Sequence, residues 1–223
     1  MAFKVYLVRH GQTMLNRYNK LQGWCDSHLT ENGVNQAKAA GRHLAHIKFD
    51  RIYYSGMMRT LKTSQVIASL NDYRADLPKP VADPDFREQG FGYFEGTYSD
   101  EAWFVAGMPH GARTLNDIIT KYSLAATMDM LKEADPFHDA ESADEFWQRI
   151  EHGLTHLRQE AKDDQKILVV GHSVLIRYII AHVAPEIDIV NNRPRNGSVT
   201  CLSFDKDKIS VDYYNHHRDD EQY

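Results

Sequence analysis

The chain has 223 residues, of which 42% are hydrophobic, a length and composition suited to one large globular domain with a substantial core. Its net charge of −5 argues against a general nucleic-acid binder or a polybasic membrane anchor. No signal-peptide pattern begins the chain, and no stretch reaches the roughly 18 apolar residues of a spanning helix, so we expect a cytoplasmic protein outside the membrane. Cys25 and Cys201 are far apart and are expected to be free thiols.

The first part of the chain alternates short apolar strands with amphipathic helices. Residues 5–8 form an apolar run typical of a buried strand, and residues 50–54 form a second. Thr30 can cap a helix that continues to about residue 48, and residues 58–70 predict another helix. This alternation predicts parallel strands joined by right-handed crossovers.

The second part contains an insertion and then returns to the same rhythm. Three prolines exclude a helix over residues 77–84, and residues 99–141 predict an insertion with helix around 115–132. Ser142 and Glu145 form a capping box for a helix that ends near residue 161. The next predicted elements are a strand at 167–170 and a helix at 174–184. They are followed by an edge-strand hairpin at 199–204 and 209–214, which turns around residues 205–208, and by a polar tail at 216–220.

These elements predict an α/β fold. We expect a three-layer α/β/α sandwich with a mostly parallel central sheet, formed by one domain over residues 1–223. A partly helical cap is expected to be inserted at about residues 96–141.

Two of the predicted strands end in a histidine next to glycine. His10 follows Arg9 after the first strand, and His172 follows Gly171 after a later one. Ligands bind at the carboxyl ends of strands in open α/β sheets, so the two imidazoles are expected to face each other. Arginine matches phosphate oxygens, and a neutral imidazole can attack phosphorus. These residue types predict phosphoryl transfer, for which the Glu88 carboxyl offers a proton donor.

Five blocks of the sequence, in order, resemble the histidine phosphatase superfamily in its phosphoglycerate-mutase-like branch. The blocks are residues 7–13 with Asn16, residues 21–24 with 29–33, residues 54–60, residues 86–96, and residues 169–177. Three positions depart from the usual pattern: Ser173 replaces a glycine after the second histidine, and Gly56 and Met57 replace a proline and a leucine.

The resemblance implies a role for each matching residue. His10 would be the nucleophile, and Glu88 would protonate the leaving group and then activate water. A protonated His172, Arg9 and Arg59 would hold the phosphoryl group. The remaining phosphate or substrate contacts implied are Gly11, Asn16, Gln22, Gly23 and Ser173. No metal and no other cofactor are implied. Glu88 and the coupled histidine pair predict a bell-shaped pH profile.

The sequence leaves several alternatives open. A cofactor-dependent phosphoglycerate mutase needs extra cations, but residues 96–141 contain three lysines and arginines against eight aspartates and glutamates, so we favour a phosphatase acting on a small phosphorylated molecule. An inactive phosphate-binding module is a further alternative. His152 and His156 have a spacing that suits a metal, although a solvated helix face is the simpler interpretation. The aromatic and methionine residues of the insertion either form its core or line the substrate: Tyr98, Trp103, Phe104 and Met108. The natural substrate and the oligomeric state stay open.

Overall fold

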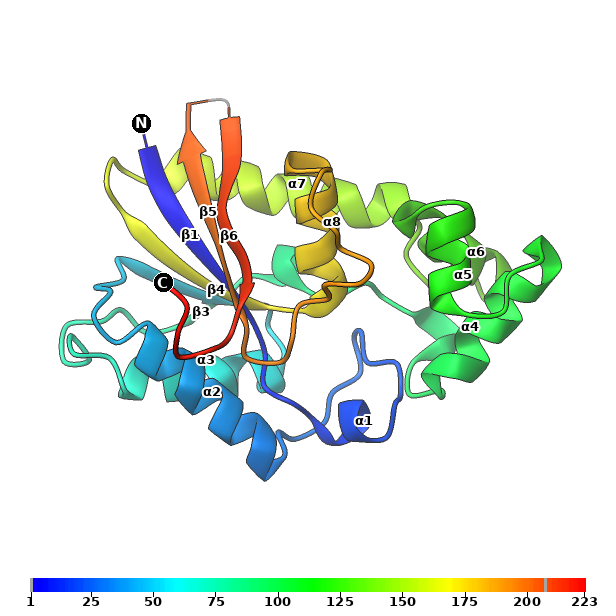
Figure 1. The fold of residues 1–223 in the computed structure, drawn as a ribbon, viewed down its shortest axis with the longest axis horizontal. Helices are drawn as coiled ribbons and strands as arrows, with labels where there is room; N and C mark the ends of the chain where they lie inside the picture. Colours follow the sequence, from blue (N-terminus) through cyan, green and yellow to red (C-terminus); the bar gives the residue numbers. More distant parts are fainter. Residues whose placement is uncertain (1, 207) are drawn as a thin grey trace.

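The computed structural model describes residues 2–206 and 208–223, which form a six-stranded mixed sheet with the order β3-β2-β4-β1-β5-β6 (Figure 1). The strands are β1 (Ala2–Arg9), β2 (Arg51–Tyr54), β3 (Val81–Ala82), β4 (Lys166–Gly171), β5 (Val199–Asp205) and β6 (Lys208–His216). Strands β3, β2, β4 and β1 are mutually parallel, whereas β5 is antiparallel to both β1 and β6. The predicted α/β fold with a mostly parallel sheet is therefore confirmed.

Helices cover both faces of the sheet and complete the three layers. In β1, Val5 and Leu7 pack in the core shared with α7 (Ala143–Glu160) and α8 (Ser173–Val183). The alternate residues Tyr6 and Val8 pack on the opposite face with α2 (Glu31–His43) and α3 (Met58–Ser69). Side chains alternate across a strand, so one apolar run supplies both cores. Figure 1 shows the two helix pairs on opposite sides of the sheet.

Helix α2 ends earlier than the sequence predicted, at His43 rather than near residue 48. The apolar spacing continues past this point, but the chain turns at Leu44, which is the C-cap residue. The Asn71 side chain donates hydrogen bonds to the carbonyl oxygens of Leu44 (3.0 Å) and Ile47 (2.9 Å). This distant amide satisfies carbonyls at the helix end, a contact that hydrophobic periodicity does not reveal.

The inserted segment forms a small helical cap (Figure 1). Its apolar core also includes Leu21, Phe91 and Phe94 from outside the insertion. It comprises α4 (Ser99–Gly107), α5 (Leu115–Lys121) and α6 (Leu124–Ala134). The single helix expected around 115–132 is divided because Ser123 adopts an extended conformation and caps α6 by accepting from the Ala126 amide. Trp103 is buried in the cap core, whereas Tyr98, Phe104 and Met108 are exposed. Helix α4 was not predicted.

The C-terminal hairpin and tail differ from the prediction in two respects. Strand β5 lies inside the sheet and only β6 is an edge strand, because β1 pairs with the free side of β5. The expected polar tail is partly ordered: His216 ends β6, and the Tyr223 ring stacks on His43 with centroids 4.3 Å apart. Part of the predicted turn, Asp207, lies outside the described residues. Within residues 2–206 and 208–223, no helix combines the length and apolarity needed to cross a membrane.

Candidate active site

The register of two parallel strands places His10 and His172 side by side. Arg9 at the end of β1 pairs with Gly171 at the end of β4, and each histidine is the first residue after its strand. The His10 amide donates to the Gly171 carbonyl at 3.0 Å. The two ring centroids are 5.2 Å apart with an interplanar angle of 65°. The expectation that the imidazoles face each other agrees with this geometry.

The hydrogen bond of His10 defines which ring nitrogen is free to react. Nδ1 lies 2.8 Å from the Gly11 carbonyl oxygen, which can only accept, so Nδ1 carries the hydrogen. Nε2 therefore keeps its lone pair. Burial, assisted by the charges of Arg59 and Arg9, holds the pKa of His10 well below its usual value. The ring is 4% exposed and neutral near pH 7, as a nucleophile requires.

The hydrogen bonds of His172 are those of a neutral ring and differ from the protonated ring that the resemblance implied. Arg59 Nη2 lies 3.2 Å from Nδ1 and can only donate, so Nδ1 accepts. Nε2 then donates to Ser55 Oγ at 2.7 Å. Ser55 donates onward to Thr60 Oγ1, which donates to the Met57 carbonyl. Burial and then the Arg59 charge hold the pKa of His172 well below its usual value.

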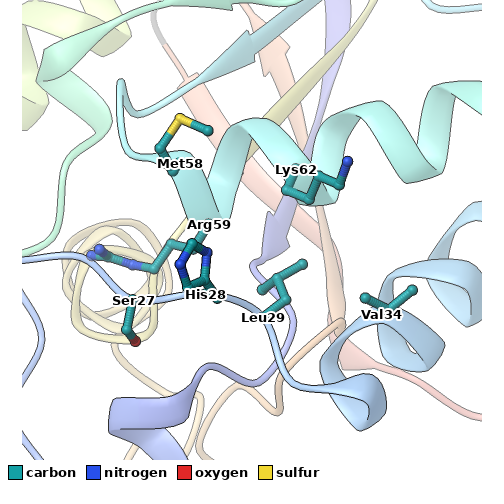
Figure 2. A pocket seen from close by; sticks show the side chains of 7 residues that line it. All are labelled: Ser27, His28, Leu29, Val34, Met58, Arg59 and Lys62. Atoms are coloured by element: carbon teal, nitrogen blue, oxygen red, sulfur yellow. The ribbon is translucent and has the colours of Figure 1, made fainter.

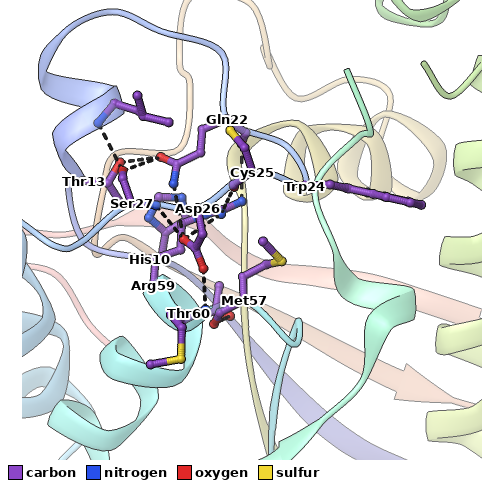
Figure 3. A network of polar contacts seen from close by, with 12 residues as sticks. His10, Thr13, Gln22, Trp24, Cys25, Asp26, Ser27, Met57, Arg59 and Thr60 are labelled. Carbon is purple, nitrogen blue, oxygen red and sulfur yellow. Dashed lines mark hydrogen bonds and ion pairs between the residues drawn. The ribbon is translucent and has the colours of Figure 1, made fainter. Parts of the chain in front are cut away.

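Arg59, at the start of α3, binds the segment formed by residues 22–26 (Figure 3). Nη1 donates to the Cys25 carbonyl (2.8 Å) and to Asp26 Oδ1 (3.1 Å), and Nη2 donates to the Gly23 carbonyl (2.6 Å). Its Nε is buried without a hydrogen-bond partner among the described residues. Arg59 therefore brings positive charge beside His172, but most of its donors already bind protein groups.

Glu88 lies at the N-terminus of α8, directly beyond His172. Its Oε2 accepts from the Val174 amide at 3.0 Å, and its Oε1 accepts from the Leu175 amide at 2.9 Å. The carboxyl is 5% exposed. Burial raises its pKa, and this effect exceeds the opposing effects of the two amides and the arginines. A carboxyl with a raised pKa is suited to donate a proton in mildly acidic or neutral solution.

A cavity of about 200 Å³ brings most of the predicted residues together. Six predicted residues line it: Arg9, His10, Asn16, Gln22, Glu88 and Ser173. Arg9 donates to the Pro194 carbonyl at 2.7 Å, while its Nε is buried and unpaired in the described part of the chain. Asn16 Oδ1 accepts from the Thr13 amide as part of a helix cap, which leaves the amino group of its side chain for a ligand.

Gly11 and Gly23 are required for close packing. A Cβ atom at Gly11 would lie 2.1 Å from the Gly33 carbonyl oxygen, and one at Gly23 would lie 2.1 Å from that of Gln89. The Gly11 amide donates to Thr63 Oγ1 at 3.2 Å and the Gly23 amide donates to Glu95 Oε2 at 2.9 Å. Both amides thus bind protein groups, so phosphate contact by these two residues, as the resemblance implied, finds no support in this geometry.

Two arginines that the sequence analysis did not select as site residues also line the cavity that contains His10, which is called the reaction cavity below. Arg177 in α8 is 2% exposed, and its Nη2 has no partner among the described residues. Burial, and then the charge of Arg193, lowers the pKa of Arg177 to about 10. The sequence did contain a signal for Arg177: it is the only lysine or arginine in the otherwise mostly apolar segment 174–184, and a cation in such a segment indicates a buried polar contact. Arg193 lies in a loop without secondary structure, and its sequence context gave no signal.

A separate cavity of about 330 Å³ lies between the segment 27–34 and the start of α3 (Figure 2). Its lining includes His28, Met58 and Lys62 together with Arg59, but neither His10, His172 nor Glu88. In Figure 2 the Arg59 guanidinium points away from Lys62. The chemistry of the site is therefore assigned to the cavity that contains His10.

The histidines on α7 bind carboxylates. His152 Nδ1 lies 2.6 Å from Asp85 Oδ2, and His156 Nδ1 lies 3.5 Å from Asp83 Oδ2. Across residues 2–206 and 208–223, no group of three or more His, Cys, Asp or Glu side chains is arranged to hold a metal ion. The i, i+4 histidine spacing is accounted for by these ion pairs.

Comparison with known proteins was made by family model, sequence and structure. The model of the histidine phosphatase superfamily (branch 1) matches residues 5–104 and 110–217. The chain is 26% identical over 202 residues to fructose-2,6-bisphosphatase TIGAR B of Danio rerio, covering 84% of this chain and 77% of that protein. It is 27% identical to the uncharacterized phosphatase PhoE of Bacillus subtilis, covering 95% and 93%. The crystal structure of phosphoglycerate mutase from Bacillus anthracis superposes with a TM-score of 0.88 and 29% identity, covering 96% and 93%.

Proposed function

Because the chain belongs to the histidine phosphatase superfamily (branch 1), as its motifs predicted, we propose that it hydrolyses a phosphomonoester through a phosphohistidine on His10. Similar proteins include phosphatases, a bisphosphatase and phosphoglycerate mutases, so phosphoryl chemistry on small molecules is the common property. The observation that carries the proposal is the His10 tautomer: an unprotonated Nε2 in a cavity shared with Arg9, Arg177 and Glu88.

The first step transfers the phosphoryl group to the enzyme. His10 Nε2 attacks phosphorus, so the N–P bond forms while the bond to the leaving oxygen breaks in line. The ring becomes cationic, and its Nδ1–H remains bonded to the Gly11 carbonyl, which stabilises that charge. Glu88 gives its proton to the leaving oxygen. Arg9 and Arg59 stabilise the negative charge on the phosphoryl oxygens.

The second step returns the enzyme to its starting state. The Glu88 carboxylate takes a proton from water, the water oxygen attacks phosphorus, and the N–P bond breaks. Phosphate leaves, and Nε2 recovers its lone pair. A bound phosphate dianion raises the pKa of a nearby imidazole, so His172 can gain its proton only when the site is charged with phosphate.

Phosphoglycerate mutase chemistry is the second candidate, and one observation favours it. Arg177 and Arg193 supply cations to the reaction cavity from outside residues 96–141, the segment whose composition argued against a mutase. These cations suit a substrate with a second anionic group, such as a bisphosphate or a phosphorylated acid. We retain hydrolysis as the proposal because the cap itself is poor in basic residues.

The test measures phosphate release from p-nitrophenyl phosphate, a panel of phosphomonoesters and both phosphoglycerates, with wild type and His10→Ala. We expect wild type to release phosphate, to incorporate an acid-labile label from a phosphorylated substrate, and to lose both properties in the variant. Faster interconversion of the phosphoglycerates than hydrolysis of any ester would select the mutase. Phosphate binding without turnover or labelling would select the inactive module.

A further inference from the structure

Arg149 in α7 binds the backbone of the loop that carries Glu88. Nη1 donates to the carbonyl oxygens of Pro84 (3.2 Å), Asp85 (2.9 Å) and Arg87 (3.1 Å). Nη2 donates to the Glu88 carbonyl itself at 3.1 Å. One side chain thus contacts four of the five residues from 84 to 88, immediately before and at the predicted acid.

The guanidinium is also held by a partly buried carboxylate. Nε and Nη2 form a two-pronged ion pair with Glu141, at 2.8 and 2.7 Å, and the two side chains are only 15% and 12% exposed. Glu141 also accepts from the Gly90 amide at 2.7 Å and donates its own amide to the Gly90 carbonyl at 2.9 Å. Paired arginine and carboxylate forks have fixed geometry, so the loop is bound on both sides of Glu88.

These contacts fix the backbone of Glu88 independently of its carboxyl. The carboxyl binds the amides of Val174 and Leu175, while the carbonyl accepts from Arg149 and from Trp24 Nε1 at 3.1 Å. Arg149 does not line the reaction cavity, so it acts through Glu88. A general acid has to be held to about 0.5 Å of its productive position.

We propose that Arg149 is the positioning residue for proton donation by Glu88, with Glu141 holding it in place. The proposal rests on the function proposed above. It predicts a substrate-dependent loss in kcat/KM, which reports phosphoryl transfer to His10 and excludes the later attack of water that all substrates share. An alkyl phosphate has a strongly basic leaving oxygen and depends on the acid, whereas p-nitrophenolate leaves without it. A residue that only stabilises the fold affects both substrates equally.

The experiment compares wild type, Arg149→Gln, Arg149→Lys and the control Arg158→Gln. Arg158 lies on the same helix over the Phe204 ring, with no hydrogen bond to the loop. The measurements are kcat and KM for p-nitrophenyl phosphate and for glycerol phosphate, across pH. For Arg149→Gln we expect kcat/KM on glycerol phosphate to fall about 10- to 100-fold, a large part of a general acid's contribution, with kcat/KM on p-nitrophenyl phosphate changed by less than about 3-fold.

Arg149→Lys keeps the charge but not the fork, so its effect should be intermediate, and Arg158→Gln should resemble wild type. The basic limb of the glycerol phosphate profile should flatten in Arg149→Gln. Equal losses on both substrates, with an unchanged pH profile, would overturn the proposal. If both Arg149 variants unfold, Glu141→Gln provides the same substrate comparison. Wild type that hydrolyses neither ester would instead reject the proposed function.

Discussion

The floor and the roof of the reaction cavity are built in different ways. The floor contains His10 and Glu88, and the ring of His172 lies 5.2 Å from that of His10. All three have defined hydrogen-bond partners and are at most 5% exposed. The roof is formed by the cap and by the loop that carries Arg193, which is exposed. Preorganised groups stabilise a transition state, whereas loosely held cations select a ligand. We therefore expect the floor to determine the reaction and the roof to determine the substrate.

Replacement of Glu88 is the strongest way to test the floor. Glu88→Gln keeps one acceptor oxygen for the amides of α8, replaces the other by an amino group that cannot accept, and removes the acidic proton. The kcat on an alkyl phosphate should therefore fall about 10²–10⁴-fold. The basic limb of the pH profile should disappear, because it reports ionisation of this carboxyl. The acid limb should remain below pH 6.5, since it reports protonation of His10, whose pKa is lowered. Steady-state kinetics from pH 4 to 9 measure both limbs.

The corresponding control makes the same change at an exposed carboxyl, Glu151 on α7. Glu151→Gln should retain the basic limb of wild type. A Glu88→Gln enzyme with an intact basic limb would show that another group donates the proton.

Arg177, which lines the cavity from α8, tests whether the cavity binds a second anion. Its unpaired Nη2 predicts that Arg177→Gln raises KM about 10- to 100-fold for a bisphosphate or a phosphorylated acid, as expected for a lost hydrogen bond to a charged group. KM for p-nitrophenyl phosphate, which lacks a second anion, should not change. Arg193→Gln should have a smaller effect of the same kind because Arg193 is exposed.

Equal effects of Arg177→Gln on all substrates would contradict a role for Arg177 in binding a second anion. Thermal unfolding of the variant separates binding from folding, since Arg177 Nε also donates to the Ile189 carbonyl at 2.8 Å. A change in KM without a change in Tm supports the ligand role.

Ser55 tests the hydrogen-bond chain that fixes the His172 tautomer. Ser55→Ala removes the acceptor for Nε2–H and leaves a buried donor unsatisfied, which costs about 1–3 kcal/mol. We expect kcat to fall about tenfold for every substrate, because the ring is no longer oriented against His10. Ser64→Ala is the matched control: Ser64 is likewise buried, in α3, which begins three residues after Ser55, and it donates to the Leu61 carbonyl. Equal losses in the two variants would argue against a role for the tautomer.

Part of the fold and of the candidate site could be predicted from the sequence, and part could not. The mostly parallel sheet, both helix layers and the neighbouring histidines follow from apolar runs that end in Arg9-His10 and Gly171-His172, because ligand-binding residues gather at the carboxyl ends of parallel strands. The order of the strands was not predicted. The protonation of His172 did not follow, since it depends on Arg59 and Ser55, which lie far away in the chain. Arg193 and the split of the cap helix depend on loop conformation, which no periodicity encodes.

The smallest expected effect concerns stability, and its sign separates His10 from Glu88. The pKa of His10 is lowered by folding, so below about pH 6.5 the unfolded chain binds more protons and stability is lost as pH falls. The slope is at most about 1.4 kcal/mol per pH unit for this group. The pKa of Glu88 is raised, so its contribution is lost as pH rises above the usual carboxyl range.

Urea unfolding at pH 5.0 to 7.5 measures these slopes in wild type, His10→Asn and Glu88→Gln. In His10→Asn the dependence of unfolding free energy on pH should become shallower, because a proton-linked group is removed. In Glu88→Gln it should become steeper, because the opposing group is removed. His28→Asn, at an exposed position, is the control and should match wild type. If His10→Asn retained the full slope, His10 would not be the buried neutral imidazole that nucleophilic attack requires.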